Sequence, residues 1–219
     1  EASRVVSPVR PDVIAKQLHG GIAGKDVLLA VRSEDTIPAG LAAGRGLSPY
    51  TAKKAPKEAS SCRVMYHGHE PSETTLEQLE VTVASIRVAQ GLQDLPPNSL
   101  TPKSFRDFVL KAISGLPGVS YDYIEAGELR EKGYGLLHAT GKSSPHPPCL
   151  LVLSLAGRSK EKGIALVGKG ITFDTGGTAL KSRVGMCGMK RDMGGAAGCF
   201  GAFLAAAKLG GPESGKALH

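Results

Sequence analysis

The chain has 219 residues, of which 41% are hydrophobic and 5% aromatic, and its formal net charge is +7. This composition is typical of a globular protein, and no apolar run approaches the length of a membrane span, so a membrane partner is not expected. The basic residues are scattered and no aromatic platform accompanies them, so the charge does not indicate a nucleic-acid partner either.

The first third of the chain carries strand and helix signals. Residues 26–31 and 62–66 are short apolar runs that predict two strands. Between them, residues 37–46 are rich in alanine and glycine and predict a short helix or a loop. Residues 52–61 are polar and basic and predict a loop. This mixture is typical of part of an α/β domain.

Two amphipathic helices are expected next. Residues 74–90 carry an apolar stripe at helical spacing, and Thr75 with Gln78 matches a capping-box pattern. The second helix is expected over residues 101–114, because Thr101 can cap a helix whose first turn contains a proline.

From about residue 100 onward, strand and helix signals alternate. Strands are expected at 119–124, 149–155 and 163–167, and helices at 126–132 and from 194 onward. Such alternation is typical of an α/β domain with a mainly parallel sheet. Ligands of these sheets bind beyond the carboxyl ends of the strands, so the segment after residue 167 is a candidate site.

That segment sets charged side chains among glycines: Lys169, Asp174, Lys181 and Asp192. Glycine lets a backbone turn sharply and lets a ligand approach the main chain. A carboxylate is a hard oxygen ligand for a divalent metal, and Asp192 precedes an expected helix start, which favours negative charge. A single lysine or aspartate in a glycine loop is usually only a surface charge, so the hypothesis depends on all four together.

The spacing of these four residues resembles that of the leucyl aminopeptidase family of two-metal exopeptidases. The resemblance implies that Lys169, Asp174 and Asp192 bind metal and that Lys181 is the catalytic lysine. It implies two divalent ions (zinc, manganese or magnesium) and, as substrate, a peptide with an apolar, leucine-like N-terminal residue. It also implies a cytoplasmic homo-oligomer, commonly a hexamer.

The same resemblance orders the domains. It implies that residues 1–72 are a remnant of an N-terminal α/β domain, that residues 73–95 are a linking helix, and that residues 96–219 are the first part of an α/β catalytic domain. The family's remaining acidic ligands lie in an Asn-Thr-Asp-Ala-Glu-Gly-Arg segment, which these 219 residues lack. We therefore expect an incomplete chain that is inactive alone. The alternative is a non-catalytic relative that serves as a structural or assembly component.

Overall fold

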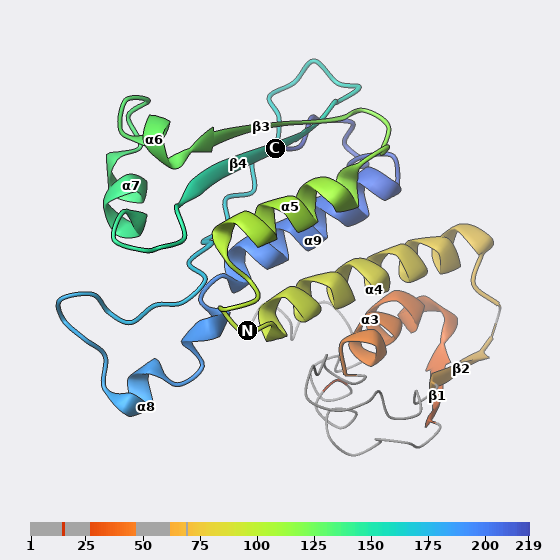
Figure 1. Cartoon of the computed structure of the whole chain (residues 1–219). Coiled ribbons are helices and arrows are strands. Elements are labelled where there is room, and N and C mark those ends of the chain that lie inside the picture. The colour runs from red at the N-terminus through yellow and green to blue at the C-terminus, as the bar shows by residue number, and fades with distance from the viewer. Residues whose placement is uncertain (1–14, 16–26, 47–61, 69) are drawn as a thin grey trace. The chain divides into compact units, whose positions relative to one another are not determined.

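The computed structural model describes residues 15, 27–46, 62–68 and 70–219 (Figure 1). The chain divides into two compact units, Glu1–Gly91 and Leu92–His219. The loop expected at residues 52–61 lies outside the described residues. No helix among the described residues is both long and apolar enough to cross a membrane.

The first unit contains a pair of parallel strands and the helix that follows each of them in the chain. β1 (Val27–Arg32) pairs with β2 (Cys62–His67), which confirms both expected strands. A single 3-10 turn, η1 (Ser33–Asp35), leads from β1 into α3 (Thr36–Gly46). The segment expected to be a short helix or a loop is therefore a helix.

Two glycines of α3 bring the long helix α4 (Glu73–Asp94) close to its backbone. A Cβ atom added to Gly40 would lie 2.6 Å from Leu79 Cδ1, and one added to Gly44 would lie 2.6 Å from Val83 Cγ1. Real Cβ atoms do not approach so closely, so these positions favour glycine. Leu79 and Val83 belong to the predicted apolar stripe, which is thus the face of α4 that packs on α3.

The start of α4 differs from the prediction. The helix begins at Glu73, and the side chain that caps it is Ser72, whose Oγ accepts a hydrogen bond from the Thr75 backbone N–H at 3.2 Å. Thr75 is therefore inside the first turn, and the capping box predicted with Gln78 is wrong. An additional turn of polar residues precedes the apolar stripe, which is why the pattern alone placed the cap too late.

The second unit packs two helices beside an antiparallel strand pair. β3 (Val119–Glu125) pairs with β4 (Cys149–Leu155), and α5 (Pro102–Ile113) lies alongside α9 (Gly194–Lys208) (Figure 1). Phe108 and Phe200 join the two helices edge to face, with ring centroids 6.3 Å apart. The core of this unit is built mainly from the following buried side chains: Leu100, Phe105, Val109, Ile113, Ile124, Leu129, Leu155, Met193, Phe200, Phe203 and Leu204.

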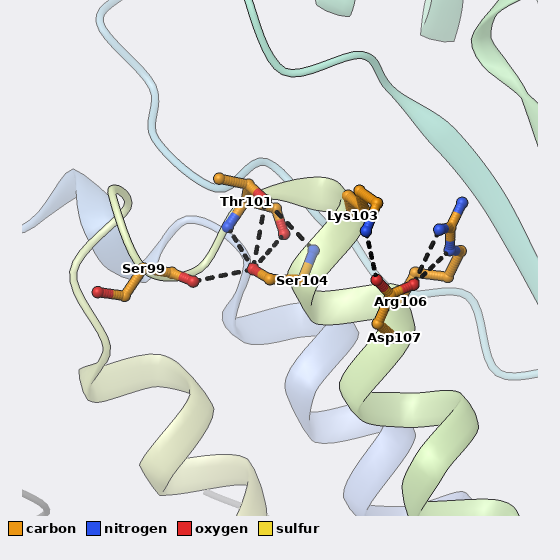
Figure 2. A network of polar contacts seen from close by, with 6 residues as sticks. All are labelled: Ser99, Thr101, Lys103, Ser104, Arg106 and Asp107. Atoms are coloured by element: carbon orange, nitrogen blue, oxygen red, sulfur yellow. Dashed lines mark hydrogen bonds and ion pairs between the residues drawn. The ribbon is translucent and has the colours of Figure 1, made fainter.

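The start of α5 confirms the expected cap. Thr101 Oγ1 accepts a hydrogen bond from the Ser104 backbone N–H at 3.2 Å, and Ser104 Oγ accepts one from the Thr101 N–H at 2.8 Å (Figure 2). Ser104 Oγ also donates to the Ser99 carbonyl at 2.8 Å. These reciprocal bonds satisfy donors at the helix start that have no partner within the helix.

The expectation of a mainly parallel sheet is not met by the described strands of this unit, because β3 and β4 are antiparallel. The helices between them, α6 (Ala126–Leu129) and α7 (Gly135–Gly141), are short and lie beyond the ends of the strands (Figure 1). A parallel connection needs a crossover of a dozen or more residues along a face of the sheet. Here the chain turns back at the strand ends instead, so these two strands are antiparallel within the α/β class that the alternating signals predicted.

The strand expected at residues 163–167 is reduced to an isolated bridge. Ile164 pairs with Leu218, and its backbone N–H donates to the Ala217 carbonyl at 2.8 Å. An apolar run forms a full strand only along a partner of similar length, and the partner among the described residues is the short segment 217–219. The bridge nonetheless directs the chain toward the glycine-rich segment that follows.

Candidate metal centre

Glycine at position 168 brings the glycine-rich segment against the start of α9. The Lys169 carbonyl accepts a hydrogen bond from the Ala196 backbone N–H at 2.8 Å. A Cβ atom added to Gly168 would lie 2.5 Å from Ala196 Cα and 2.8 Å from the Gly195 carbonyl oxygen. These neighbours are backbone atoms that cannot move aside, so Lys169 reaches α9 only because residue 168 has no side chain.

Lys169 and Asp192 form the first of two charged pairs. Lys169 Nζ lies 3.1 Å from Asp192 Oδ2, and the exposed fractions of the side chains are 58% and 20%. Asp192 directly follows the 3-10 turn η2 (Met189–Arg191), and the fully buried Met193 separates it from α9.

The contact between them is an ion pair without hydrogen-bond alignment. Asp192 Oδ2 is buried and has no hydrogen-bond partner among the described residues, although the ammonium group is within ion-pair distance. The two observations are compatible, because a short distance does not guarantee a favourable hydrogen-bond angle. Here the Lys169 ammonium group supplies the compensating charge, and a buried carboxylate oxygen that accepts no hydrogen bond is also a suitable ligand for a metal ion.

Asp174 and Lys181 form the second pair. Lys181 Nζ donates to Asp174 Oδ2 at 2.5 Å, and the Gly176 backbone N–H donates to Asp174 Oδ1 at 2.8 Å. The Lys181 backbone N–H closes the loop by donating to the Thr175 carbonyl at 2.9 Å. Gly176 has a φ of +92°, a conformation that favours glycine. The loop thus holds the carboxylate and the ammonium group against each other.

The electrostatics connect the two pairs. The hydrogen bond from Lys181 is the main reason that the pKa of Asp174 lies below its ordinary value, and the Gly176 N–H is the second. The positive charges of Lys181 and Lys169 lower the pKa of Asp174 further. Lys169 thus acts on the charge of Asp174 while it pairs with Asp192, which is the link between the two pairs.

The donors match a divalent ion in type but not in number. No group of three His, Cys, Asp or Glu side chains that could hold a metal occurs among the described residues. Carboxylates suit hard divalent cations, and a lysine amine can bind metal once it has lost its proton. A protein-bound metal ion takes about four or more ligands, so two aspartates and one lysine supply only part of a centre.

One polar contact beside Asp192 was not predicted from the sequence. Lys190 Nζ donates to the backbone carbonyl of Asp94 at 2.5 Å, although 96 positions separate the two residues. Both residues belong to the second unit. Local patterns cannot reveal such a contact, and the only sequence signal was a lysine close to a candidate ligand.

The chain is similar to known aminopeptidases over much of its length. A family model described as the catalytic domain of the cytosol aminopeptidase family matches residues 87–217. The human probable aminopeptidase NPEPL1 is 40% identical over 137 residues, which cover 63% of this chain and 26% of that protein. A probable cytosol aminopeptidase of Xylella fastidiosa (strain M12) is 35% identical over 159 residues, which cover 73% of this chain and 32% of that protein.

The fold is also shared with solved structures. The apo structure of leucyl aminopeptidase from Trypanosoma cruzi superposes with a TM-score of 0.83 at 35% identity, over 100% of this chain and 44% of that one. This likeness confirms the predicted α/β class. The chain spans about a quarter to a third of the curated relatives described above. From the family match and the shared fold, we conclude that the chain belongs to the cytosol aminopeptidase family.

Proposed function

We propose that the full-length protein is a metal-dependent aminopeptidase that releases leucine-like N-terminal residues from peptides. The observations that carry the proposal are the Lys169–Asp192 pair at the start of α9 and the Asp174–Lys181 pair, whose carboxylate also feels the charge of Lys169. Membership of the cytosol aminopeptidase family supports the same interpretation, because the matched region includes all four residues, whose spacing resembles the family's pattern.

In this proposal Lys169, Asp174 and Asp192 hold two divalent ions. The buried Oδ2 of Asp192, which faces Lys169 but accepts no hydrogen bond from the described residues, supports this assignment. When bound, such ions polarise the carbonyl of the scissile bond and lower the pKa of a water molecule. Carboxylates and an amine do not select sharply among zinc, manganese and magnesium, so the proposal includes all three.

Lys181 has a different role, because it donates a hydrogen bond to the carbonyl oxygen of the substrate as negative charge develops there. A donor that is already oriented stabilises such charge better than one that must be ordered during the reaction. The contact with Asp174 Oδ2 and the closure of the loop onto Thr175 provide this orientation.

The proposal extends to a cytoplasmic homo-oligomer, a hexamer by resemblance, that acts on peptides. This part rests on family membership. Sedimentation of the full-length protein should show a species larger than the monomer, and a monomer at micromolar concentration would contradict it.

Hydrolysis of leucyl amides by the full-length protein with added Mn²⁺ tests the proposal. Asp174→Ala and Lys181→Ala should each reduce turnover to the background rate. Asp107→Ala and Lys103→Ala are matched controls, because Lys103 Nζ and Asp107 Oδ2 form an exposed pair 2.9 Å apart on α5. The controls should retain wild-type turnover. Wild-type turnover in either site variant would refute the assignment.

A further inference from the structure

Lys190 connects the segment that carries Asp192 to the end of α4. Its ammonium group donates to the carbonyl of Asp94, the last residue of that helix. The last carbonyls of a helix have no partner within the helix, and the negative end of the helix dipole favours a cation. Both effects favour this contact, and Lys190 is half-buried.

The segment that receives this support is intrinsically weak. η2 is one turn of 3-10 helix that follows Gly188, whose φ is +86°. Its backbone bonds join Arg191 N–H to the Gly188 carbonyl at 3.0 Å and Asp192 N–H to the Met189 carbonyl at 3.2 Å. Such turns have poorer hydrogen-bond geometry than an α-helix and need support from outside.

Two fixed points flank Asp192. Lys190 anchors the residues before it to α4, and Met193 after it is 0% exposed. The last turn of α4 also lies close to the start of α9, because a Cβ atom on Gly194 would come within 2.4 Å of the side-chain amide nitrogen of Gln93. The carboxylate of Asp192 thus depends for its direction on how η2 lies against the end of α4.

We infer that Lys190 is a positioning residue for the metal centre. It keeps η2 on the end of α4, so that the half-buried Asp192 holds its buried Oδ2 toward Lys169, and it contacts neither metal nor substrate. The inference rests on the proposed function, because it assigns the effect of Lys190 to metal binding. Partners that orient metal ligands typically change metal affinity by about 10–100-fold when they are removed.

The test is the affinity of the metal-free, full-length protein for Mn²⁺, measured by calorimetric titration. Lys190→Met should weaken binding by about tenfold or more. The kcat for a leucyl amide at saturating Mn²⁺ should stay close to the wild-type value. Lys190→Arg keeps a donor and a charge and should restore most of the affinity. Lys216→Met is the control, since Lys216 is also a half-buried lysine and pairs with Glu161 at 2.9 Å. The Mn²⁺ affinity of this control variant should equal that of the wild type.

A second readout needs no metal. In Lys190→Met the backbone amides of Arg191 and Asp192 should exchange hydrogen faster than in the wild type, because η2 loses its anchor. Lys216→Met should not show this change. A folded Lys190→Met protein with wild-type Mn²⁺ affinity and wild-type exchange would overturn the inference. If that variant does not fold, Lys190→Gln, which lacks the reach and the charge, replaces it, and the same result would overturn the inference.

Asp192→Asn separates this inference from the proposed function. If Asp192→Asn binds Mn²⁺ as the wild type does, Asp192 is not a ligand and the proposed centre fails. If Asp192→Asn loses binding while Lys190→Met and Lys190→Gln keep it, the proposed centre stands and only the role of Lys190 fails.

Discussion

Two lysine–aspartate pairs in the second unit show the same chemistry in different settings. Lys103 and Asp107 lie on the surface of α5, with exposed side-chain fractions of 75% and 44% (Figure 2). Lys181 and Asp174 lie in the glycine-rich loop, with fractions of 28% and 31%. In both pairs the hydrogen bond from the lysine is the main reason that the pKa of the aspartate lies below its ordinary value.

The difference lies in what holds each pair together. Lys103 and Asp107 are one helical turn apart, so the helix alone makes them neighbours. The loop pair instead needs the turn at Gly176 and the closure onto Thr175, and a second lysine, Lys169, acts on the same carboxylate. A lowered pKa therefore does not by itself identify a site. The meeting of separate segments around the pair is the informative feature.

The largest effect is expected from Gly168→Ala, which should disrupt the glycine-rich loop. The new methyl group would meet the backbone at Ala196 and Gly195, so the segment must shift and carry Lys169 away from Asp192. We expect the free energy of unfolding to fall by about 1–3 kcal/mol and Mn²⁺ binding to be lost. Urea denaturation and calorimetric titration of the full-length protein measure the two effects.

Gly170→Ala is the matched control. A Cβ atom at Gly170 would meet Ala196 Cβ at 3.6 Å, an ordinary contact distance, so stability and metal binding should change little. Equal losses of stability and Mn²⁺ binding in Gly168→Ala and Gly170→Ala would show that the loop does not depend on the close approach at Gly168.

Contacts between segments that are distant in the chain also decide which features could be predicted from the sequence alone. The start of α5 was predictable because Thr101 and its partner Ser104 are neighbours in the chain. The direction of β4 and the anchoring of Lys190 depend on contacts that are distant in sequence, and no local pattern encodes them. The site residues could be proposed because their spacing matched a family, but their pairing came only from the structure.

The next effect concerns the α5 region. Thr101→Ala removes the acceptor for the Ser104 N–H and should lower the free energy of unfolding by about 1 kcal/mol. Thr101→Ser keeps the hydroxyl group and should remain within a few tenths of a kcal/mol of the wild type. Thermal denaturation of the two variants checks this, and equal stability would show that the cap contributes nothing.

A smaller effect concerns the pKa of Asp174 in the metal-free protein. Because this pKa is lowered in the folded state, the carboxylate contributes stability above its ordinary pKa of 3.8, and this is lost as the pH falls through the lowered value. Lys181→Met should raise the pKa of Asp174 part of the way toward 3.8 and weaken this acid dependence, because the Gly176 N–H still donates to the carboxylate. Carbon NMR titration of the carboxyl group measures the shift, and an unchanged pKa would contradict the assigned cause.

The smallest effect is expected from Lys103→Met, which removes the lysine of the exposed pair on α5. The pKa of Asp107 should rise only part of the way to its ordinary value, because Arg106 also donates to Asp107 Oδ1, at 2.8 Å. Exposed ion pairs of this kind contribute little to stability, so the denaturation midpoint and Mn²⁺ affinity should not change measurably. Weaker Mn²⁺ binding in this variant would mean that the α5 pair influences the loop.

The central claim is that Lys169, Asp174 and Asp192 belong to one metal centre. Anomalous diffraction from crystals of the full-length protein grown with Mn²⁺ tests it most directly. We predict anomalous peaks at the carboxylates of Asp174 and Asp192, with the Lys169 amine at coordination distance. Peaks elsewhere, with Asp174 still bonded to Lys181 and Asp192 still paired with Lys169, would contradict the account.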